Sequence, residues 1–246
     1  MRCLVMHKNC PEDEAGVEPT QELIQNMGAL IGELARAGTF LDGGGLRESA
    51  QRYRLHRDGA GWRVSRGPYE GVHELPAGIA IFQTATWEEA LEWGRRFGEA
   101  VGAEELELGL MTEEWDLGLC ERPANPPIRA LIQHKATKAT ESGRAPTPAQ
   151  RDALAALTVE MVDAGVLLFH ETLRPSADAT RLVYRDNERR VIDGPFTESK
   201  ELIGGFCLLQ MRSLDEVLAM CDRYVRILGG TREIDVRPLL EGGAGR

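Results

Sequence analysis

The sequence has no long run of apolar residues. No stretch approaches the roughly 18 uninterrupted apolar residues of a transmembrane helix, so we expect no membrane span. The start of the chain, residues 1–8, holds only a short apolar run, whereas the core of a signal peptide needs roughly 7–15 residues. The sequence therefore predicts neither a membrane partner nor an export signal.

Positive charge is also scarce. The chain of 246 residues has 29 Lys and Arg against 39 Asp and Glu, and its net charge is -10. A general nucleic-acid-binding protein needs a basic surface that neutralises phosphates, so we expect no nucleic-acid partner. Disorder is excluded for the bulk of the chain, because 42% of the residues are hydrophobic.

Cysteines are few and widely spaced: Cys3, Cys10, Cys120, Cys207 and Cys221. Their odd number and the absence of CxxC or HExxH spacing argue against a disulfide framework and against a zinc site. The glycine-rich stretch 42–45 lacks the spacing of a phosphate-binding loop. We therefore expect free thiols, a cytoplasmic protein, no metal and no cofactor.

What the chain does contain is an internal repeat. An offset of 127 residues aligns residues 3–97 with residues 130–224 without a gap, and many aligned pairs are identical. They include His7 with His134, Lys8 with Lys135, Arg47 with Arg174, Ser49 with Ser176, Arg54 with Arg181, and Gly67-Pro68 with Gly194-Pro195. This pattern indicates a tandem duplication.

The repeat divides the chain into two copies and a linker. The first copy spans residues 1–118 and the second spans residues 128–246. Residues 119–127 include the stretch Pro123-Ala124-Asn125-Pro126-Pro127, which predicts an extended and fairly stiff connection.

Each copy has the order β-α-β-hairpin-β-α-β. In the second copy the apolar run 128–134 predicts a strand, and Thr147 before Pro148 predicts a helix start. Ser213, with Glu216 three residues later, predicts a capping box at the second helix.

This split β-α-β order is the ferredoxin-like pattern, in which both helices cover one face of the sheet. The bare faces of two such sheets can cover each other. The sequence therefore predicts an α+β fold with two ferredoxin-like repeats packed sheet to sheet as a pseudo-dimeric α/β barrel.

The sharpest local motif is the stretch 193–206, which begins Asp193-Gly194-Pro195-Phe196. It resembles the DGPF motif of YCII-related (YciI-like) proteins, and the resemblance covers most of residues 128–240. It covers residues 1–118 more weakly, through Gly67-Pro68-Tyr69 among other positions. The resemblance implies a dimeric α/β barrel and an active site built from a histidine and an aspartate. It also implies a link to alternative sigma factors, because DGPF genes often lie beside sigma-factor genes.

His134 and Asp193 are the candidate catalytic residues. In a ferredoxin-like sheet the first and third strands are antiparallel neighbours, so the end of the first strand, at His134, meets the start of the third strand, where the DGPF loop enters. A carboxylate beside an imidazole raises its basicity and fixes its tautomer, which suits a general base. The alternative is a strand-end histidine bonded to a loop carbonyl, with Asp193 bonded to its own turn.

Five further residues are candidates for substrate binding: Lys200, Arg174, Lys135, His7 and Arg66. Arg174 could hold a carboxylate with two hydrogen bonds or form a structural ion pair, and Lys135 could anchor an anion or end its strand in solvent. Because Arg66 stands where the second copy has Asp193, we expect any chemistry in the second copy and a supporting role for His7 and Arg66.

Three functions remain open at this point. The first is a cofactor-independent enzyme that acts on a small molecule by His/Asp acid–base chemistry, as a lyase or isomerase would. The second is a non-catalytic ligand-binding or regulatory module linked to an alternative sigma factor, with self-association as a further partner class. The third is a structural or stress protein. A pocket lined by paired titratable groups favours the first, and a filled apolar interior favours the second.

Overall fold

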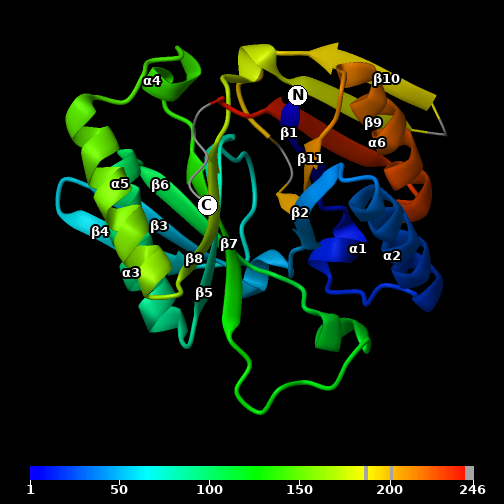
Figure 1. Cartoon of the computed structure of the whole chain (residues 1–246), viewed down its shortest axis with the longest axis horizontal. Helices are drawn as coiled ribbons and strands as arrows, with labels where there is room; N and C mark the ends of the chain where they lie inside the picture. The colour runs from blue at the N-terminus through cyan, green and yellow to red at the C-terminus, as the bar shows by residue number, and fades with distance from the viewer. Residues whose placement is uncertain (186–187, 200–201, 242–246) are drawn as a thin grey trace.

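Two antiparallel sheets of six strands each pack against one another in the computed structural model, which describes residues 1–185, 188–199 and 202–241 (Figure 1). The first sheet, sheet I, has the order β10-β9-β12-β1-β11-β2. Its strands are β1 (Arg2–Lys8), β2 (Phe40–Gly45), β9 (Thr180–Arg185), β10 (Glu188–Asp193), β11 (Ile203–Gln210) and β12 (Arg232–Pro238).

The second sheet, sheet II, has the order β4-β3-β6-β7-β5-β8. Its strands are β3 (Tyr53–Asp58), β4 (Gly61–Arg66), β5 (Pro76–Thr84), β6 (Glu105–Leu110), β7 (Ile128–Lys135) and β8 (Leu167–Thr172). The class is therefore α+β, as expected.

Two pairs of helices form the outer layers (Figure 1). Helices α2 (Gln21–Arg36) and α6 (Leu214–Leu228) cover sheet I, and α3 (Trp87–Val101) and α5 (Pro148–Asp163) cover sheet II. Short helices α1 (Pro11–Glu14) and α4 (Lys138–Glu141) follow β1 and β7, and 3-10 turns η1 (Ser49–Gln51), η2 (Glu114–Leu117) and η3 (Ser176–Asp178) complete the elements.

The expected helix starts are confirmed. The Thr147 side chain accepts a hydrogen bond from Gln150 N and completes a capping box, and Pro148 is the first helical residue. Ser213 accepts from Glu216 N, but Glu216 accepts from Arg212 N rather than from Ser213 N, so the second half of the expected capping box does not form.

One expectation about the fold is wrong: the two copies do not build separate sheets. Strands β1 and β2 of the first half lie in sheet I with β9–β12, and β7 and β8 of the second half lie in sheet II with β3–β6. The exchange is possible because β1 and β7 have the same alternation of side chains, so β1 fits between β11 and β12 while β7 fits between β5 and β6.

The space between the sheets is filled by apolar side chains from both. The central cluster includes Leu4, Met6, Ile79, Ile81, Met111, Leu131, Leu173, Ile203, Phe206, Leu208 and Leu239. Two bridges, Leu46 with Met111 and Leu173 with Leu239, also join strand ends of one sheet to those of the other. The two sheets therefore share one apolar core.

The strand exchange predicts how the chain behaves when it is divided in the linker. Residues 1–121 and 122–246, expressed together as separate chains, should copurify as a tight 1:1 complex, because each supplies the central strand of the other's sheet. Each fragment expressed alone should expose apolar strand faces and aggregate or form a domain-swapped dimer. A single fragment that is monomeric, with a cooperative unfolding transition, would contradict this arrangement.

Candidate functional site

The two Gly-Pro motifs have a common structural role. A Cβ on Gly67 would overlap the carbonyl oxygen of Ser49, and a Cβ on Gly194 would overlap that of Ser176. Both Gly-Pro peptide bonds are cis. Glycine is therefore required at both positions by close backbone packing.

The residue after each proline is tied to the same serine. Phe196 N donates to Ser176 Oγ at 3.1 Å, and that hydroxyl donates to Glu141. In the first half, Tyr69 N donates to Ser49 Oγ, and that hydroxyl donates to Glu14. The motif thus anchors each loop to a 3-10 turn, and this role needs no ligand.

The two anchored loops meet above the ends of β1 and β7. His73 N donates to Ser199 O at 2.8 Å and Ser199 N donates to His73 O at 2.9 Å. Each loop also holds the strand end of the other half, through Asn9 N to Leu202 O and Ala136 N to Leu75 O. The loops therefore close one end of the space between the sheets.

Beneath the loops, Lys8 of sheet I and Lys135 of sheet II line the same small cavity. Lys8 Nζ lies 2.9 Å from Asp235 Oδ2, and Lys135 Nζ lies 3.3 Å from Glu107 Oε2. All four side chains are buried. Because side chains alternate along a strand, the last residue of β1 and of β7 points between the sheets, while the histidine before it points toward the helices.

Arginines complete both ion-pair networks. Arg54 donates to Glu107 from Nε and Nη2, and Arg181 donates to Asp235 from Nε and Nη2. Arg52 adds a contact to Glu107 at 3.3 Å. These pairs give each buried carboxylate two or more cationic partners, while Arg54 and Arg181 also pair with the more exposed acids Glu105 and Glu233. We call the cavity and the buried charged side chains around it the chamber; they are Lys8, Lys135, Arg52, Glu107 and Asp235.

The charge balance is visible in the pKa values. Burial raises the pKa of Glu107, but Lys135, Arg52 and Arg54 outweigh it and hold that pKa well below its usual range. The pKa of Asp235 falls to about 2, because Lys8 and Arg181 outweigh its burial. Burial lowers the pKa of Lys135, and Glu107 opposes that change. Both acids are therefore ionised at neutral pH.

His73 is the histidine that faces this chamber. Arg54 Nη2 lies 3.1 Å from its Nδ1, and because arginine only donates, Nδ1 accepts and the proton of the neutral ring sits on Nε2. Burial and Arg54 lower the pKa of His73 to about 4. At neutral pH it is thus an uncharged hydrogen-bond donor.

A cleft of about 470 Å³ opens beside His73. It is lined by Glu14, Tyr69, Glu70, Gly71, Val72, His73 and Leu202. His73 and Leu202 also line the inner cavity, which has room for about one water molecule. The cleft therefore adjoins the cavity that the two lysines line.

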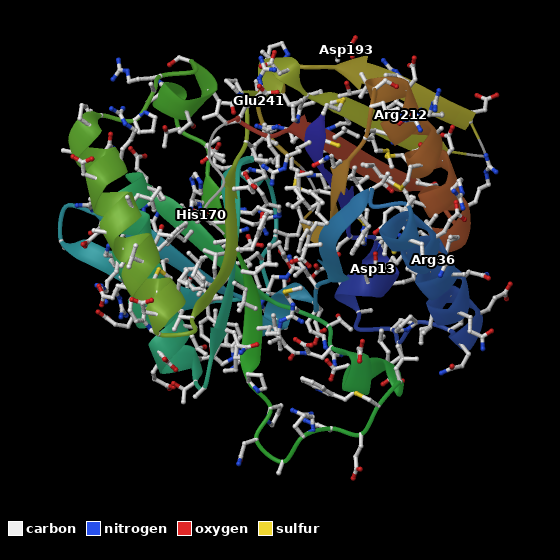
Figure 2. The ribbon with its side chains drawn as sticks, viewed as in Figure 1. Asp13, Arg36, His170, Asp193, Arg212 and Glu241 are labelled. Carbon is white, nitrogen blue, oxygen red and sulfur yellow. The ribbon has the colours of Figure 1, made fainter. Side chains whose placement is uncertain are left out.

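The expected contact between His134 and Asp193 does not form. His134 lies in β7 of sheet II, between Gly78 and Leu106, whereas Asp193 ends the edge strand β10 of sheet I. Figure 2 shows Asp193 at the rim of sheet I, pointing away from the molecule and far from His170. The strand exchange is the cause, because it pairs β7 with the first half and not with the DGPF loop.

His134 and His7 are packed under the helices. The His134 ring lies 6.4 Å from that of Phe97, and burial followed by His170 lowers its pKa to about 4. His7 Nδ1 lies 2.8 Å from the Tyr224 hydroxyl, and burial lowers the pKa of His7 to about 4 as well. Neither ring lines the cavity or the cleft described above.

The remaining candidates lie in several places. Arg66 is exposed and donates to Ala50 O, and Arg174 forms an ion pair with Asp178 at 3.0 Å, which was the structural alternative for that residue. Lys200 lies outside the described residues. Of the candidates named from the sequence, Lys135 lines the chamber.

Sequence reasoning missed Glu107, Asp235 and His73. A signal was available for the two acids: each lies between apolar residues of its half's final strand, at a position where an apolar core would exclude a lone charge. His73 gave no such signal, because it does not recur in the second copy.

Within residues 1–185, 188–199 and 202–241, no group of three or more His, Cys, Asp or Glu side chains is arranged to hold a metal ion. No helix within these residues is long and apolar enough to cross a bilayer.

Comparisons with known proteins point to one family. A sequence model of the YCII-related domain matches residues 129–239. The uncharacterized protein R00369 of Rhizobium meliloti (strain 1021) is 37% identical over 86 residues, which are 35% of this chain and 69% of that protein. No solved structure matches the chain.

The buried network predicts a large effect of Glu107→Gln. The change leaves Lys135 and Arg52 buried without their counter-charge, so the free energy of unfolding should fall by about 3–5 kcal/mol. Asp58→Asn, which breaks the more exposed pair with Arg63, should cost about 1 kcal/mol or less. Urea denaturation at pH 7 measures both, and equal losses would contradict the network.

The buried histidines predict a pH dependence of stability. The pKa of His134 is about 4 in the folded chain and about 6.5 when unfolded, so the unfolded chain binds more protons between these values. Stability is therefore full above pH 6.5 and declines as the pH falls toward 4, with a loss of about 2 kcal/mol per such histidine between pH 7 and pH 5.

His134→Gln should remove about that amount from the pH dependence, measured by urea denaturation at pH 5, 6 and 7. His56→Gln, at an exposed position, serves as the control and should keep the wild-type slope. An unchanged slope in the His134 variant would show that this ring does not stay neutral in the folded chain.

Proposed function

Because the chain belongs to the family of proteins that carry a YCII-related domain, we propose that it binds a small organic anion in the cleft beside His73 and acts on it by acid–base chemistry without a cofactor. The observation that carries this proposal is the pair of buried lysines, Lys8 and Lys135, which come from two different sheets and line one cavity that adjoins the cleft.

The charge of the chamber supports an anionic ligand. Among its buried side chains, Lys8, Lys135 and Arg52 outnumber the carboxylates Glu107 and Asp235, and buried charges act more strongly than charges in water. A carboxylate or a developing oxyanion directed at the lysines would balance the excess. The Tyr69 ring, Val72 and Leu202 offer apolar contact to the rest of a small molecule.

One group suits proton transfer and a second suits hydrogen bonding to the ligand. Lys135 has a lowered pKa, which brings its ammonium group closer to neutral pH as an acid. His73 carries its proton on Nε2, from which it can donate a hydrogen bond to a carbonyl or carboxylate oxygen. In this proposal Lys135 takes the acid–base role instead of His134 and Asp193, and His73 orients the ligand through its hydrogen bond.

The finer architecture belongs to the same proposal. We interpret the two halves as a duplicated ferredoxin-like unit whose first two strands are exchanged, which gives a pseudo-dimeric barrel on one chain. A cytoplasmic location fits the five free cysteines, because reduced thiols persist in that compartment.

A regulatory ligand-binding module is the second candidate. The apolar cluster that fills most of the space between the sheets favours it, since a filled interior leaves a ligand only the outer cleft. On this reading the bound ligand would change the contact of the chain with a protein partner, such as an alternative sigma factor, and would leave unaltered.

A ligand screen tests the proposal. Small carboxylates, keto acids and organic phosphates should include compounds that raise the melting temperature at pH 7. Lys135→Met and His73→Gln should weaken this effect at least tenfold in ligand concentration, whereas Arg66→Ala, at an exposed position, should not change it. If the screen yields only cations or neutral molecules, or if the effect survives in both chamber variants, the proposal is wrong.

The same compounds separate catalysis from regulation. Each hit is incubated with the protein and followed by proton NMR. A new product, formed about 10²-fold more slowly by Lys135→Met, supports the enzyme. A ligand that binds through the chamber and stays unaltered supports the regulatory module.

A further inference from the structure

The two halves differ in how a buried arginine is paired. Arg237, at the end of β12, is 1% exposed. Its Nη2 donates to Arg174 O at 2.7 Å, but Nε and Nη1 have no hydrogen-bond partner within the described part of the chain. Leaving such donors buried and unpaired carries a large desolvation cost.

Arg52 shows the same arrangement with every group paired. Its Nε and Nη2 donate to the carbonyl oxygen of Arg47, which is the sequence match of Arg174. Its Nη1 donates to Glu107 Oε1 at 3.3 Å. The two guanidinium groups therefore bind matched carbonyl oxygens, although Arg52 lies just before β3 and Arg237 lies near the end of β12.

The length of the neighbouring acid accounts for the unpaired Nη1 of Arg237. Glu107 lies opposite Arg54 where β3 pairs with β6, and Asp235 lies opposite Arg181 where β9 pairs with β12. Because Arg54 and Arg181 are matched in sequence, Asp235 is the counterpart of Glu107. Asp235 is shorter, and its oxygens bind Lys8 and Arg181. Arg237 lacks the oxygen that Glu107 gives to Arg52.

The other nearby acid does not fill this role. Glu141 Oε1 lies 3.7 Å from Arg237 Nη2, beyond hydrogen-bond distance, and its Oε2 accepts from Ser176. Burial lowers the pKa of Arg237, and the nearby acids Glu141, Asp235 and Asp178 oppose that change without outweighing it.

We propose that Arg237 is the receptor of an oxyanion, one oxygen of which takes the place beside Nη1 that the Glu107 carboxylate takes beside Arg52. The ligand class is a carboxylate group or an inorganic phosphate or sulfate ion, since a guanidinium group binds such oxygens with strong, charge-assisted hydrogen bonds. Arg237 lines neither the cavity nor the cleft described above, so this site is separate from the proposed substrate cleft.

Asp235→Glu is the decisive variant, because it restores in the second half the side chain of the first. Melting temperatures are measured in sodium phosphate, sulfate and acetate, with sodium chloride at equal ionic strength as the reference. The wild type should gain roughly 2–5 °C at an anion concentration about tenfold above its dissociation constant. Asp235→Glu should melt higher than the wild type in chloride and lose the gain.

Two more variants keep the test informative. Arg237→Met should also lose the response, which covers the case in which Asp235→Glu folds poorly. Glu107→Asp makes the opposite change, leaves Arg52 Nη1 short of a partner and should increase the response. A response to acetate alone assigns the site to an organic carboxylate, and one to phosphate and sulfate assigns it to an inorganic ion.

Two results would overturn the proposal. One is a wild-type protein that responds equally to chloride and to all three oxyanions. The other is an oxyanion response that is unchanged in both Asp235→Glu and Arg237→Met. A failure of this proposal can be told apart from a failure of the proposed function. Lys135→Met and His73→Gln leave Arg237 intact, so both variants should keep the oxyanion response.

Discussion

The pairing of each central strand with the other half of the chain is the constraint on which the rest of the structure depends. Strand β1 hydrogen-bonds to β11 and β12, and β7 hydrogen-bonds to β5 and β6. Neither sheet is complete without both halves. The pairing also brings Lys8 beside Asp235 and Lys135 beside Glu107, so each buried ion pair joins one half to the other. The family match to residues 129–239 is continuous in sequence, yet those residues divide between the two sheets.

Local features of the fold could be predicted because they depend on neighbouring residues. The Thr147-Pro148 helix start, the hairpins and the α+β class follow from capping groups and from alternation within a few residues. The partner of β1 could not be predicted in this way. Strands β5 and β6 of the first half and β11 and β12 of the second half offer similar apolar edges, so the alternation within β1 does not select between them.

The error at the candidate site follows from the same cause. Placing His134 beside Asp193 assumed that the second half closes on itself, and the exchange separates them. The resemblance to YCII-related proteins implies a histidine and an aspartate, so it favours His134 over the lysine beside it. Counting side-chain directions along 128–135 would have placed Lys135 among the inward-facing residues with Leu131. The DGPF motif itself is explained by the contacts of Gly194 and Phe196 with Ser176.

The covalent connection between the halves has a consequence for how the chamber can change over time. In an assembly of two identical chains, every substitution appears twice, and both copies of a buried network must tolerate it. Here Glu107 and Asp235 occupy corresponding positions but are encoded separately, as are Arg66 and Asp193. The first half can therefore keep its fully paired network around Arg52 while the second half loses one contact to Arg237. The stability retained in the first half allows the second half to change its residues.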